Sequence, residues 1–459
     1  MLELEIRNLL VQAVGRERFL DSPEERAVYS YDASKANFLP DAVVFPESVS
    51  EIAAILQICQ QHGVRVIPRG AGSGITGGAL PLQGGVILGL NGFDQILEID
   101  EDNLVAVVQP GVVTSRLQEA VREKGLFYPP DPASMEFSTI GGNIAENSGG
   151  MKAVKYGVTK DYVLGLEVVL PSGEVINTGS KCVKDVVGYN LTQLFVGSEG
   201  TLGVITKAVL RLLPLPEARK TMTAVFADMQ SAGRTVSRII KDKVIPAAIE
   251  FLDAKALWCV EHYLKLGLPE GAGAFLLVEV DGDPDLLEKD ILKVQRICEA
   301  NQALTIEVAS THDEQERLWR ARRSVSASMA HYGAYKKINE DIVVPRASIP
   351  DFIAKVQDIA DRFHCPIINF GHAGDGNIHM NVLVPRPEDL ERGHQAVEAV
   401  FDVTVELGGR ISGEHGIGLS KREYIGKNLS PEVQALMKRI KAAFDPKDIL
   451  NPGKMFNPE

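Results

Sequence analysis

The amino-acid sequence predicts an α+β protein with at least two domains. The chain has 459 residues, which is more than one hydrophobic core usually supports, and 45% of them are apolar. Helical and strand-like segments alternate through the first half. In the second half, strand-like runs are separated by helices and end in a hairpin pattern, which indicates an antiparallel sheet covered by helices.

The first domain is expected to span residues 1–216, and its first 40 residues look helical. A helix predicted over Ser50–Gln61 ends at Gly63, because glycine readily adopts the left-handed conformation that closes a helix. A second helix over Thr114–Lys124 ends at Gly125 for the same reason. The strand-like runs cover residues 64–67, 86–90, 105–108, 166–170 and 204–213.

Two prolines, Pro214 and Pro216, mark the end of this domain. A second domain is expected over residues 217–410, followed by a C-terminal segment of helices over residues 411–459. The elements predicted in the second domain are strands at Ala274–Val280 and Leu304–Val308, a helix over His312–His331 and the hairpin described next.

Three histidines and a carboxylate gather among glycines in two stretches, INFGHAGDGNIHMNVL from Ile368 and GEHGIG from Gly413. The pair Asp375-Gly376 predicts a two-residue hairpin turn, which would place His372 and His379 directly opposite each other. Opposed side chains in a hairpin have Cβ atoms about 4.5–5.5 Å apart. Two imidazoles at that separation can bind one cation, so the pattern predicts a metal site.

Glu414 and His415 are neighbours, so in an extended chain their side chains point to opposite sides. Only one of them needs to bind the metal. The carboxylate of Glu414 with His372 and His379 would form an open site that suits catalytic Zn²⁺, Mn²⁺ or Fe²⁺. His415 would then be left to move a proton. The alternative is that these are loop histidines bonded to the backbone.

A glycine-rich loop, PRGAGSGITGGALP over Pro68–Pro81, follows a strand-like run. Gly72, Gly74 and Gly77 match the GxGxxG spacing of dinucleotide-binding folds. That fingerprint also needs a helix at its last glycine, and Gly78 with the proline after it prevents one. A loop without a helix can still bind a pyrophosphate by directing successive backbone N–H groups at it. The sequence therefore predicts a dinucleotide bound by a different fold.

Three further stretches rich in glycine and small polar residues follow, at residues 129–150, 155–163 and 196–206. Each alone is typical of ordinary turns. Together with the first loop they resemble the FAD-binding domain of the vanillyl-alcohol oxidase and p-cresol methylhydroxylase superfamily. From Ala42 to Phe456 the chain resembles its FAD-dependent D-2-hydroxyacid dehydrogenase branch, which includes D-lactate dehydrogenases and glycolate oxidase flavoprotein subunits.

This resemblance implies a two-part FAD-binding domain over residues 1–216, an antiparallel substrate cap over 217–410 and a return of 411–459 to the FAD domain. It implies FAD bound without a covalent link, because residues 69–81 contain no histidine. It also places His372, His379 and Glu414 on the family's metal ligands and His415 on its catalytic base.

The resemblance further assigns the residues that contact FAD. Those of the pyrophosphate loop are Arg69, Gly70, Ala71, Gly72, Ser73, Gly74, Thr76, Gly77 and Gly78. Those along the isoalloxazine ring and ribityl chain are Pro130, Asp131, Ser138, Gly141, Gly142, Asn143, Asn147, Ser148, Gly149 and Gly157. Those near the adenosine are Glu199, Gly200, Gly203 and Ile205, and Asn451 and Lys454 lie in the segment that returns to the flavin.

Arg322 lies on the inward stripe of the predicted helix, beside Leu318 and Val325. An inward arginine needs an anion, which is either a substrate carboxylate or a buried acidic side chain. The pattern from Trp319 to Arg322 also matches the family's substrate-binding arginine. Relatives that oxidise a dicarboxylate carry a lysine shortly downstream, and the lysines near residue 336 stand at a shifted spacing, which leaves 2-hydroxyglutarate open.

The resemblance implies oxidation of a D-2-hydroxyacid, D-lactate or glycolate, to the 2-oxoacid. Arg322 would hold the carboxylate, the metal would hold the hydroxyl, and His415 would take its proton while a hydride passes to FAD. Three alternatives stay open: a D-2-hydroxyglutarate dehydrogenase, an oxidase that uses O₂, and an electron-transferring subunit that docks to an iron–sulfur or electron-transfer-flavoprotein partner. A metal-binding protein without catalysis would not need the arginine and the base.

Composition limits the partners. A net charge of −13 argues against nucleic acid and anionic membranes, which require a basic face. There is no signal peptide and no long apolar run, so a soluble, cytoplasmic protein is expected. Five cysteines without CxxC spacing are expected to be buried thiols and supply no iron–sulfur cluster, so electrons must pass to an external acceptor. The oligomeric state stays open, with a homodimer as one option.

Overall fold

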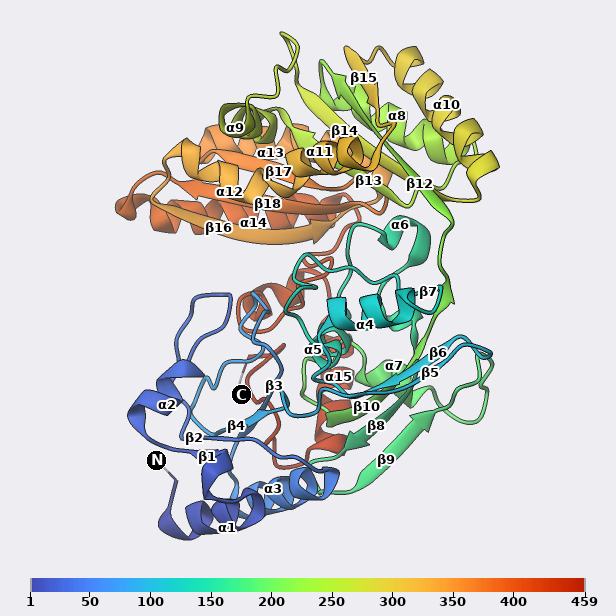
Figure 1. Cartoon of the computed structure of the whole chain (residues 1–459). Coiled ribbons are helices and arrows are strands. Elements are labelled where there is room, and N and C mark those ends of the chain that lie inside the picture. The colour runs from blue at the N-terminus through green and yellow to red at the C-terminus, as the bar shows by residue number, and fades with distance from the viewer. Residues whose placement is uncertain (1, 458–459) are drawn as a thin grey trace. The chain divides into compact units, whose positions relative to one another are not determined.

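The structure is a computed structural model that describes residues 2–457, and its elements are labelled in Figure 1. The chain divides into two compact units. The first unit contains the chain up to Gly150, Val158–Leu215 and the chain from Glu414 onward. The second contains Met151–Gly157 and Pro216–Gly413. The mixed helix and sheet content is that of the predicted α+β class.

The first unit contains a small sheet in the order β1-β2-β4-β3. Its strands are β1 (Phe19–Leu20), β2 (Ala42–Val44), β3 (Val66–Arg69) and β4 (Val86–Gly89). The last three are parallel and β1 is antiparallel to β2. Helices α1 (Leu4–Val14) and α3 (Val49–His62) lie side by side against this sheet and bury Leu10, Ile52 and Ile55 (Figure 1). As predicted, α3 ends at Gly63, which is left-handed.

A second sheet of the first unit is antiparallel, in the order β5-β6-β10-β8-β9. Its strands are β5 (Ile96–Asp100), β6 (Val105–Val108), β8 (Val163–Val169), β9 (Val175–Gly179) and β10 (Val204–Arg211). The strand predicted over 204–213 is therefore divided, because β10 ends at Arg211 and β11 (Leu213–Pro214) pairs with β7 (Leu126–Phe127). The remaining helices of this part are α2 (Pro23–Val28), α4 (Thr114–Arg122), α5 (Ile140–Glu146) and α7 (Leu191–Phe195).

The first 40 residues contain helices α1 and α2 and a short 3₁₀ turn, as expected, together with strand β1. The expectation that all five cysteines are buried is wrong. Four cysteines are buried, but Cys182 is exposed in the loop after β9. That loop also exposes Val186 and Tyr189, so it does not bury the Cys182 side chain either.

The second unit is built on one antiparallel seven-stranded sheet, in the order β15-β12-β14-β13-β17-β18-β16. Its strands are β12 (Ala218–Phe226), β13 (Ala248–Asp253), β14 (Ala274–Gly282), β15 (Thr305–Val308), β16 (Lys336–Val343), β17 (Ile367–His372) and β18 (Asn377–Val384). Short helix α6 (Ala153–Tyr156) also belongs to this unit.

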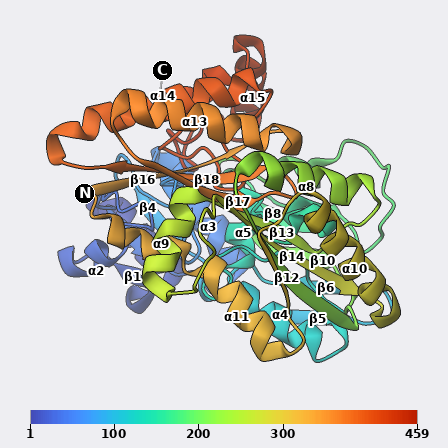
Figure 2. The ribbon, with the colours of Figure 1, turned by 90° about the horizontal axis from the view of Figure 1, so that it is seen from above.

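Helices cover both faces of this sheet. One group consists of α8 (Met229–Lys241), α10 (Pro284–Ala300), α13 (Ile349–Phe363) and α14 (Leu390–Glu406). The other consists of α9 (Ala254–Leu264), α11 (His312–Arg323) and α12 (Val325–Ser328). Figure 2 shows α13 and α14 beside each other on one side of the strands. The core under α9 and α11 contains Leu252, Trp319 and Phe370.

The predicted hairpin is present, but its register differs from the prediction. Phe370 pairs with His379 and His372 pairs with Asn377, so the loop has four residues rather than two. Gly376 in this loop packs against the backbone carbonyl of Val344, where a side chain would not fit. His372 and His379 are therefore diagonal neighbours on one face and not directly opposed.

The helix predicted over His312–His331 is also interrupted. Helix α11 ends at Arg323, α12 occupies Val325–Ser328, and a 3₁₀ turn covers Met329–Tyr332. Arg322 therefore lies in the last turn of α11 and is buried, as its place on the apolar stripe predicts.

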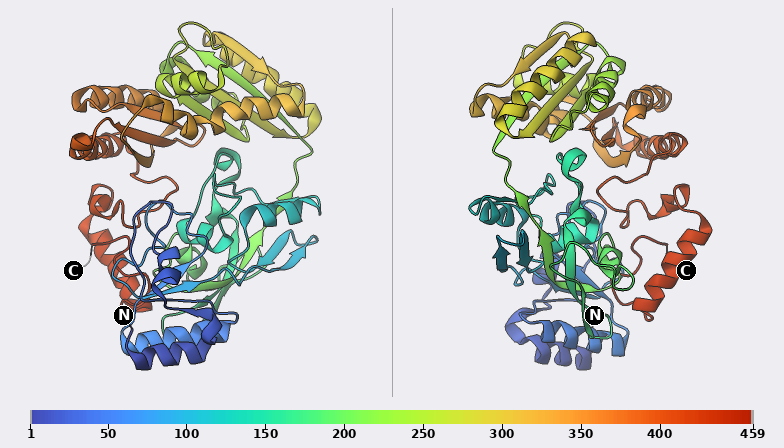
Figure 3. Two further views of the ribbon diagram at one scale, coloured as in Figure 1. Left: turned by 60° about the vertical axis from the view of Figure 1, so that its left-hand side comes forward. Right: turned by 90° about the vertical axis from the view of Figure 1, so that its right-hand side faces the viewer.

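The C-terminal segment lies in the first unit, where Figure 3 shows it in red with α15 (Pro431–Phe444). The backbone of Val66 in β3 donates to Ile449 and accepts from Asn451. This bonding adds the C-terminal segment to the edge of the small sheet. None of the helices that the structure describes is long and apolar enough to cross a membrane.

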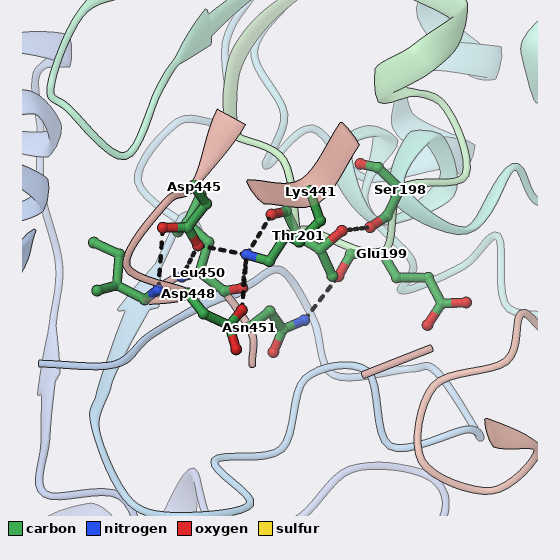
Figure 4. Close-up of polar contacts among 9 residues, drawn as sticks. Ser198, Glu199, Thr201, Lys441, Asp445, Asp448, Leu450 and Asn451 are labelled. Atoms are coloured by element: carbon green, nitrogen blue, oxygen red, sulfur yellow. Dashed lines mark hydrogen bonds and ion pairs between the residues drawn. The ribbon is translucent and has the colours of Figure 1, made fainter. Parts of the chain in front are cut away.

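A buried carboxylate holds this segment in place. Asp445 is fully buried and accepts hydrogen bonds from the backbone N–H groups of Ile449, at 3.1 Å, and Leu450, at 2.7 Å. It also pairs with Lys441, whose Nζ donates to the carbonyls of Thr201 and Leu450 at 2.9 Å (Figure 4). One ion pair thus connects α15, the C-terminal segment and the loop before β10.

Replacing this carboxylate should destabilise the first unit. Asp445→Asn leaves Lys441 without its buried counter-charge, so we expect a loss of about 2–4 kcal/mol in the free energy of unfolding. The matched control is Asp448→Asn, because Asp448 lies 3.2 Å from the same Lys441 but is 63% exposed. Exposed pairs contribute about 0–1 kcal/mol. Chemical denaturation should separate the variants, and equal midpoints would contradict this account.

Candidate active site

The loop between β3 and β4 contains no helix, as its glycines and prolines predict. Gly72 and Gly77 have φ angles of 68° and 83°, which side chains rarely adopt. Among the described residues, none accepts a hydrogen bond from the backbone N–H groups of Ala71, Gly72, Ser73, Gly74 or Ile75. A row of N–H groups without protein acceptors is what a pyrophosphate-binding loop requires.

This loop lines a cavity of about 340 Å³ in the first unit. The other walls come from α5 with the residues that follow it, and from the turn before β10. The predicted cofactor residues that line it are Arg69, Gly70, Ala71, Gly72, Ser73, Gly74, Gly78, Gly141, Gly142, Asn143, Ser148, Gly149, Glu199, Gly200, Gly203, Ile205 and Asn451. The predicted base His415 and its neighbour Glu414 also line this cavity.

Some predicted cofactor residues do not line the cavity. They are Thr76, Gly77, Pro130, Asp131, Ser138, Asn147 and Gly157, and Gly157 belongs to the second unit. Ser138 is instead buried in a network in which Asn143 donates to Thr114 at 2.7 Å. Residues that sequence reasoning missed include Pro110, Ser134, Thr139 and Glu146. The last three lie in the glycine-rich stretch 129–150, which was the available signal.

Two glycines allow the walls of the cavity to meet. A Cβ atom at Gly70 would lie 2.4 Å from Oγ1 of Thr139, and one at Gly141 would lie 2.6 Å from Cβ of Pro110. Real Cβ atoms do not approach other atoms so closely, so a side chain at Gly70 would force the glycine loop away from the start of α5, and one at Gly141 would force α5 away from Pro110. The glycines thus serve close packing as well as cofactor access.

Charged side chains around the cavity mainly hold its loops together. Arg69 donates to the carbonyls of Tyr31, at 2.8 Å, and Ala79, at 3.4 Å. Lys454 donates to the carbonyls of Gly77 and Leu80, at 2.9 and 2.5 Å. Burial lowers the pKa of Lys454 to about 8, against the attraction of nearby carboxylates. These cations therefore act on the backbone of the glycine loop.

Glu199 fixes the stretch that carries the predicted base, and Asn451 in turn bonds to the backbone of Glu199. The Glu199 carboxylate accepts from the backbone N–H groups of Ile417 and Gly418, both at 2.7 Å. Burial raises the pKa of Glu199, although these two hydrogen bonds oppose the rise. Asn451 donates to the carbonyls of Gly78 and Glu199, and Figure 4 shows the second of these bonds.

Glu414 and His415 lie at the start of this stretch. Nε2 of His415 is 3.8 Å from Oε1 of Glu414, and the carbonyl of His415 accepts a hydrogen bond from Thr76 at 3.1 Å. Glu414 directly follows Gly413, the last residue of the second unit. Within that unit, the Gly413 N–H donates to Asp341, which pairs with His379 across β16 and β18. Gly413, where the chain leaves the second unit, is therefore bonded to the residue that pairs with His379.

The two hairpin histidines of the second unit have the geometry of metal ligands. Their Nε2 atoms are 3.4 Å apart, and their rings are nearly perpendicular. Two nitrogens that bind one tetrahedral Zn²⁺ at about 2.0–2.1 Å are themselves about 3.4 Å apart. His372 and His379 therefore fit a divalent ion, although they are diagonal neighbours in the hairpin and not directly opposed as predicted.

Sequence reasoning missed the buried carboxylate of Glu250. Its Oε1 lies 2.6 Å from Nδ1 of His372, and its Oε2 accepts a hydrogen bond from Nε of Arg322 at 2.6 Å. Burial alone would raise the pKa of Glu250, but the His372 and Arg322 side chains lower it below the ordinary value. A charged residue inside the apolar strand Ala248–Asp253 was the available signal.

Arg322 thus has an acidic partner, which was the alternative to a substrate carboxylate. The contact uses only Nε, and the guanidinium stacks on Phe370 at 4.7 Å from the ring centroid. The two terminal amino groups are not used by Glu250. A bound carboxylate is therefore compatible with this ion pair.

Comparisons with known proteins identify the family. The C-terminal domain of the FAD linked oxidases matches residues 215–455, and an FAD binding domain matches residues 40–179. A glycolate oxidase subunit GlcD of Bacillus subtilis is 48% identical over 99% of this chain and 97% of that protein. A D-lactate dehydrogenase of Anaerostipes hadrus is 35% identical over 94% and 91%. A D-2-hydroxyglutarate dehydrogenase of Stutzerimonas stutzeri is 35% identical over 91% of each chain.

Among solved structures, p-cresol methylhydroxylase with substrate bound matches with a TM-score of 0.83 at 18% identity, over 99% of this chain and 96% of that one. Alkyldihydroxyacetonephosphate synthase matches with a TM-score of 0.77 at 21% identity, over 98% and 85%. These likenesses concern the fold. Taken with the sequence matches, they show that the chain belongs to the FAD-linked oxidases of the vanillyl-alcohol oxidase and p-cresol methylhydroxylase fold and is an FAD-dependent oxidoreductase.

Proposed function

We propose that this protein oxidises a D-2-hydroxyacid, D-lactate or glycolate, to the 2-oxoacid. The observation that carries the proposal is the set formed by buried Arg322, Glu250 and His372 with the partly buried His379 in the second unit. A 2-hydroxyacid presents a carboxylate with a hydroxyl on the next carbon. Arg322 would bind the carboxylate, and an ion held by the histidine pair would bind the hydroxyl. Glu250 connects the two, because it contacts both Arg322 and His372. The names of the relatives, which refer to glycolate, D-lactate and D-2-hydroxyglutarate, support the same class.

Arg322 would bind the substrate carboxylate through its two terminal amino groups. A planar guanidinium donates two parallel hydrogen bonds to a carboxylate, which fixes the direction of the acid as well as its position. Phe370 supports this role because it stacks under the guanidinium at 4.7 Å and limits its rotation.

His372, His379 and Glu414 would hold a divalent ion, Zn²⁺, Fe²⁺ or Mn²⁺. When bound, such an ion supplies a Lewis acid that lowers the pKa of an alcohol. The 3.4 Å separation of the two Nε2 atoms supports the histidine ligands. The position of Glu414 directly after the anchored Gly413 supports the third ligand.

His415 would act as the base that takes the hydroxyl proton, a contribution of about 10²- to 10⁴-fold. Its place on the wall of the cofactor cavity supports this role. FAD, when bound, supplies the acceptor for the hydride. We propose that it is held without a covalent bond, because residues 69–81 contain no histidine, and extraction under denaturing conditions tests this.

An external acceptor would reoxidise the flavin. The five cysteines are isolated from one another in the sequence, so the chain offers no cluster of thiolates for an iron–sulfur centre. We propose a partner that carries an iron–sulfur cluster or a second flavin. The O₂-using alternative predicts rapid reoxidation in air.

D-2-Hydroxyglutarate is a second candidate substrate. Lys337 lies on the same face of the sheet as His379, because it is four residues before Asp341 on β16. Its Nζ donates to Ser326 at 3.1 Å, which places a cation on the side of the sheet that carries Arg322. A second carboxylate could use this lysine.

The metal proposal predicts a specific effect of His379→Ala. The variant should keep FAD and its spectrum, because the cofactor cavity lies in the first unit, but should lose bound metal and flavin reduction by D-lactate or glycolate. Chelation of the wild-type protein should do the same. The control is His394→Ala, an exposed histidine of α14. Elemental analysis with anaerobic spectroscopy decides, and unchanged reduction by metal-free protein would make the hairpin histidines structural.

If His415 is the base, its replacement should slow flavin reduction without loss of bound metal. His415→Asn should retain stoichiometric metal and FAD, while flavin reduction falls by about 10²-fold or more. Glu414→Gln should lose both together, since loss of a carboxylate ligand weakens the ion that the reaction needs. Metal analysis of both variants beside single-turnover rates makes the comparison. The reverse pattern, with metal lost from the His415 variant only, would exchange the two roles.

A further inference from the structure

We propose that Glu250 is a positioning residue that orients a metal ligand, His372, and the substrate-binding Arg322 at the same time. The inference rests on the proposed function, because it assigns a partner to two of its groups. Glu250 itself would contact neither the ion nor the substrate. Its effect would be exerted through the two side chains that it holds.

The position of Glu250 is set by the sheet. It lies in the middle of β13, where it pairs with His372 across β17, and its side chain is fully buried. Paired residues in an antiparallel sheet point to the same face, so Glu250, His372, Phe370 and His379 share one face. Burial of an unpaired carboxylate would cost free energy. Glu250 therefore needs hydrogen-bond partners on the same face.

The two oxygens of Glu250 serve two different donors. Oε1 faces Nδ1 of His372 at 2.6 Å, and Oε2 accepts from Nε of Arg322 at 2.6 Å. An arginine is always charged and donates only, so the carboxylate that faces it is ionised and accepts only. Each oxygen is therefore committed to one partner.

For His372, this contact determines which ring nitrogen carries the proton. A carboxylate that only accepts requires a proton on Nδ1, which leaves the lone pair on Nε2. That Nε2 is the atom that faces Nε2 of His379 at 3.4 Å. A carboxylate behind a histidine also raises the basicity of the ligating nitrogen, and loss of such a partner costs about 10- to 100-fold in metal affinity.

For Arg322, the same carboxylate fixes the direction of the guanidinium. The group is planar, its Nε edge is held by Glu250 and its plane lies over Phe370 at 4.7 Å. With one edge and the plane determined, the two terminal amino groups can point in only one direction. The acid that they bind would thus have a defined orientation relative to His372.

Glu250→Gln tests this arrangement with a side chain of the same shape. Glutamine has one acceptor oxygen and a donating amide nitrogen. It can keep the bond to His372 or the bond to Arg322, but it must present an N–H group to the other donor. We therefore expect weaker binding of both the metal ion and the substrate carboxylate. His372 and Arg322 would each adopt the orientation that binds for only part of the time.

Glu279 provides a matched control in the same sheet. It is buried on β14, next to β13, but both of its donors, Nε1 of Trp319 and Oγ1 of Thr221, use the same oxygen, Oε2, at 2.8 Å. Glu279→Gln can therefore keep both bonds through its single oxygen. It removes a buried charge from the same core without disturbing His372 or Arg322.

The experiment measures two bindings separately. Metal-free, FAD-loaded protein is titrated with Zn²⁺, and in a separate titration without metal it is titrated with pyruvate. Glu250→Gln should bind Zn²⁺ about 10- to 100-fold more weakly and pyruvate about 10-fold more weakly, because the charge-assisted hydrogen bond that orients Arg322 is weakened. Glu279→Gln should stay within about twofold of wild type in both, as expected where no bond is lost.

Two further measurements separate positioning from general support of the fold. With ¹⁵N-labelled histidine, the His372 signals, identified by their absence from His372→Asn, should report the Nδ1-protonated form in wild type and Glu279→Gln and a different form in Glu250→Gln. In an Arg322→Lys background, Glu250→Gln should weaken pyruvate binding little further, because contacting residues are not additive.

The outcomes are distinct. If Glu250→Gln binds Zn²⁺ and pyruvate as Glu279→Gln does, Glu250 only supports the fold and the inference is wrong. If only one of the two affinities falls, the dual role is contradicted. If wild-type protein binds neither Zn²⁺ nor pyruvate, the proposed function fails, and the inference fails with it.

Discussion

A carboxylate in the middle of a buried sheet has to be paired, and in the second unit this requirement organises the polar groups around it. Glu250 receives its partners from two directions, His372 from the neighbouring strand and Arg322 from a helix above. Because the register of β13, β17 and β18 determines which side chains share this face, a shift of one residue would remove His372 and His379 from it together. The fold therefore holds one predicted metal ligand, His372, and the predicted substrate arginine through one carboxylate.

In the first unit the constraint is different: the glycine loop has to leave backbone N–H groups free of protein acceptors so that they can bind an anion. The glycine loop leaves a row of them without protein acceptors, while its carbonyls are held by Lys454 and Asn451 from the C-terminal segment. One side of the loop is thus anchored and the other is available to an anion. The same C-terminal segment is fixed to β3 and to Asp445, so the glycine loop is held by residues that are remote from it in the sequence.

The features that depend on local sequence patterns could be predicted from the sequence. The helix that ends at Gly63, the loop without a helix and the inward face of Arg322 follow from periodicity and turn chemistry. The hairpin was predicted with the wrong register, because an Asp-Gly pair does not by itself determine the loop length, which is four residues. Glu250 was missed because its partners lie 72 and 122 residues away in the sequence. Thr139 and Glu146 likewise reach the cavity only through the packing of α5.

The most direct test of the proposed chemistry is anaerobic mixing of the purified, FAD-loaded protein with 2-hydroxyacids, followed by the visible spectrum of the flavin. A carboxylate held by Arg322 and a hydroxyl directed to the metal would leave one face of the substrate carbon for hydride loss. We therefore expect D-lactate or glycolate to bleach the flavin stoichiometrically and L-lactate to leave it oxidised. An oxidised flavin with every 2-hydroxyacid, or equal bleaching by both lactate enantiomers, would contradict the account.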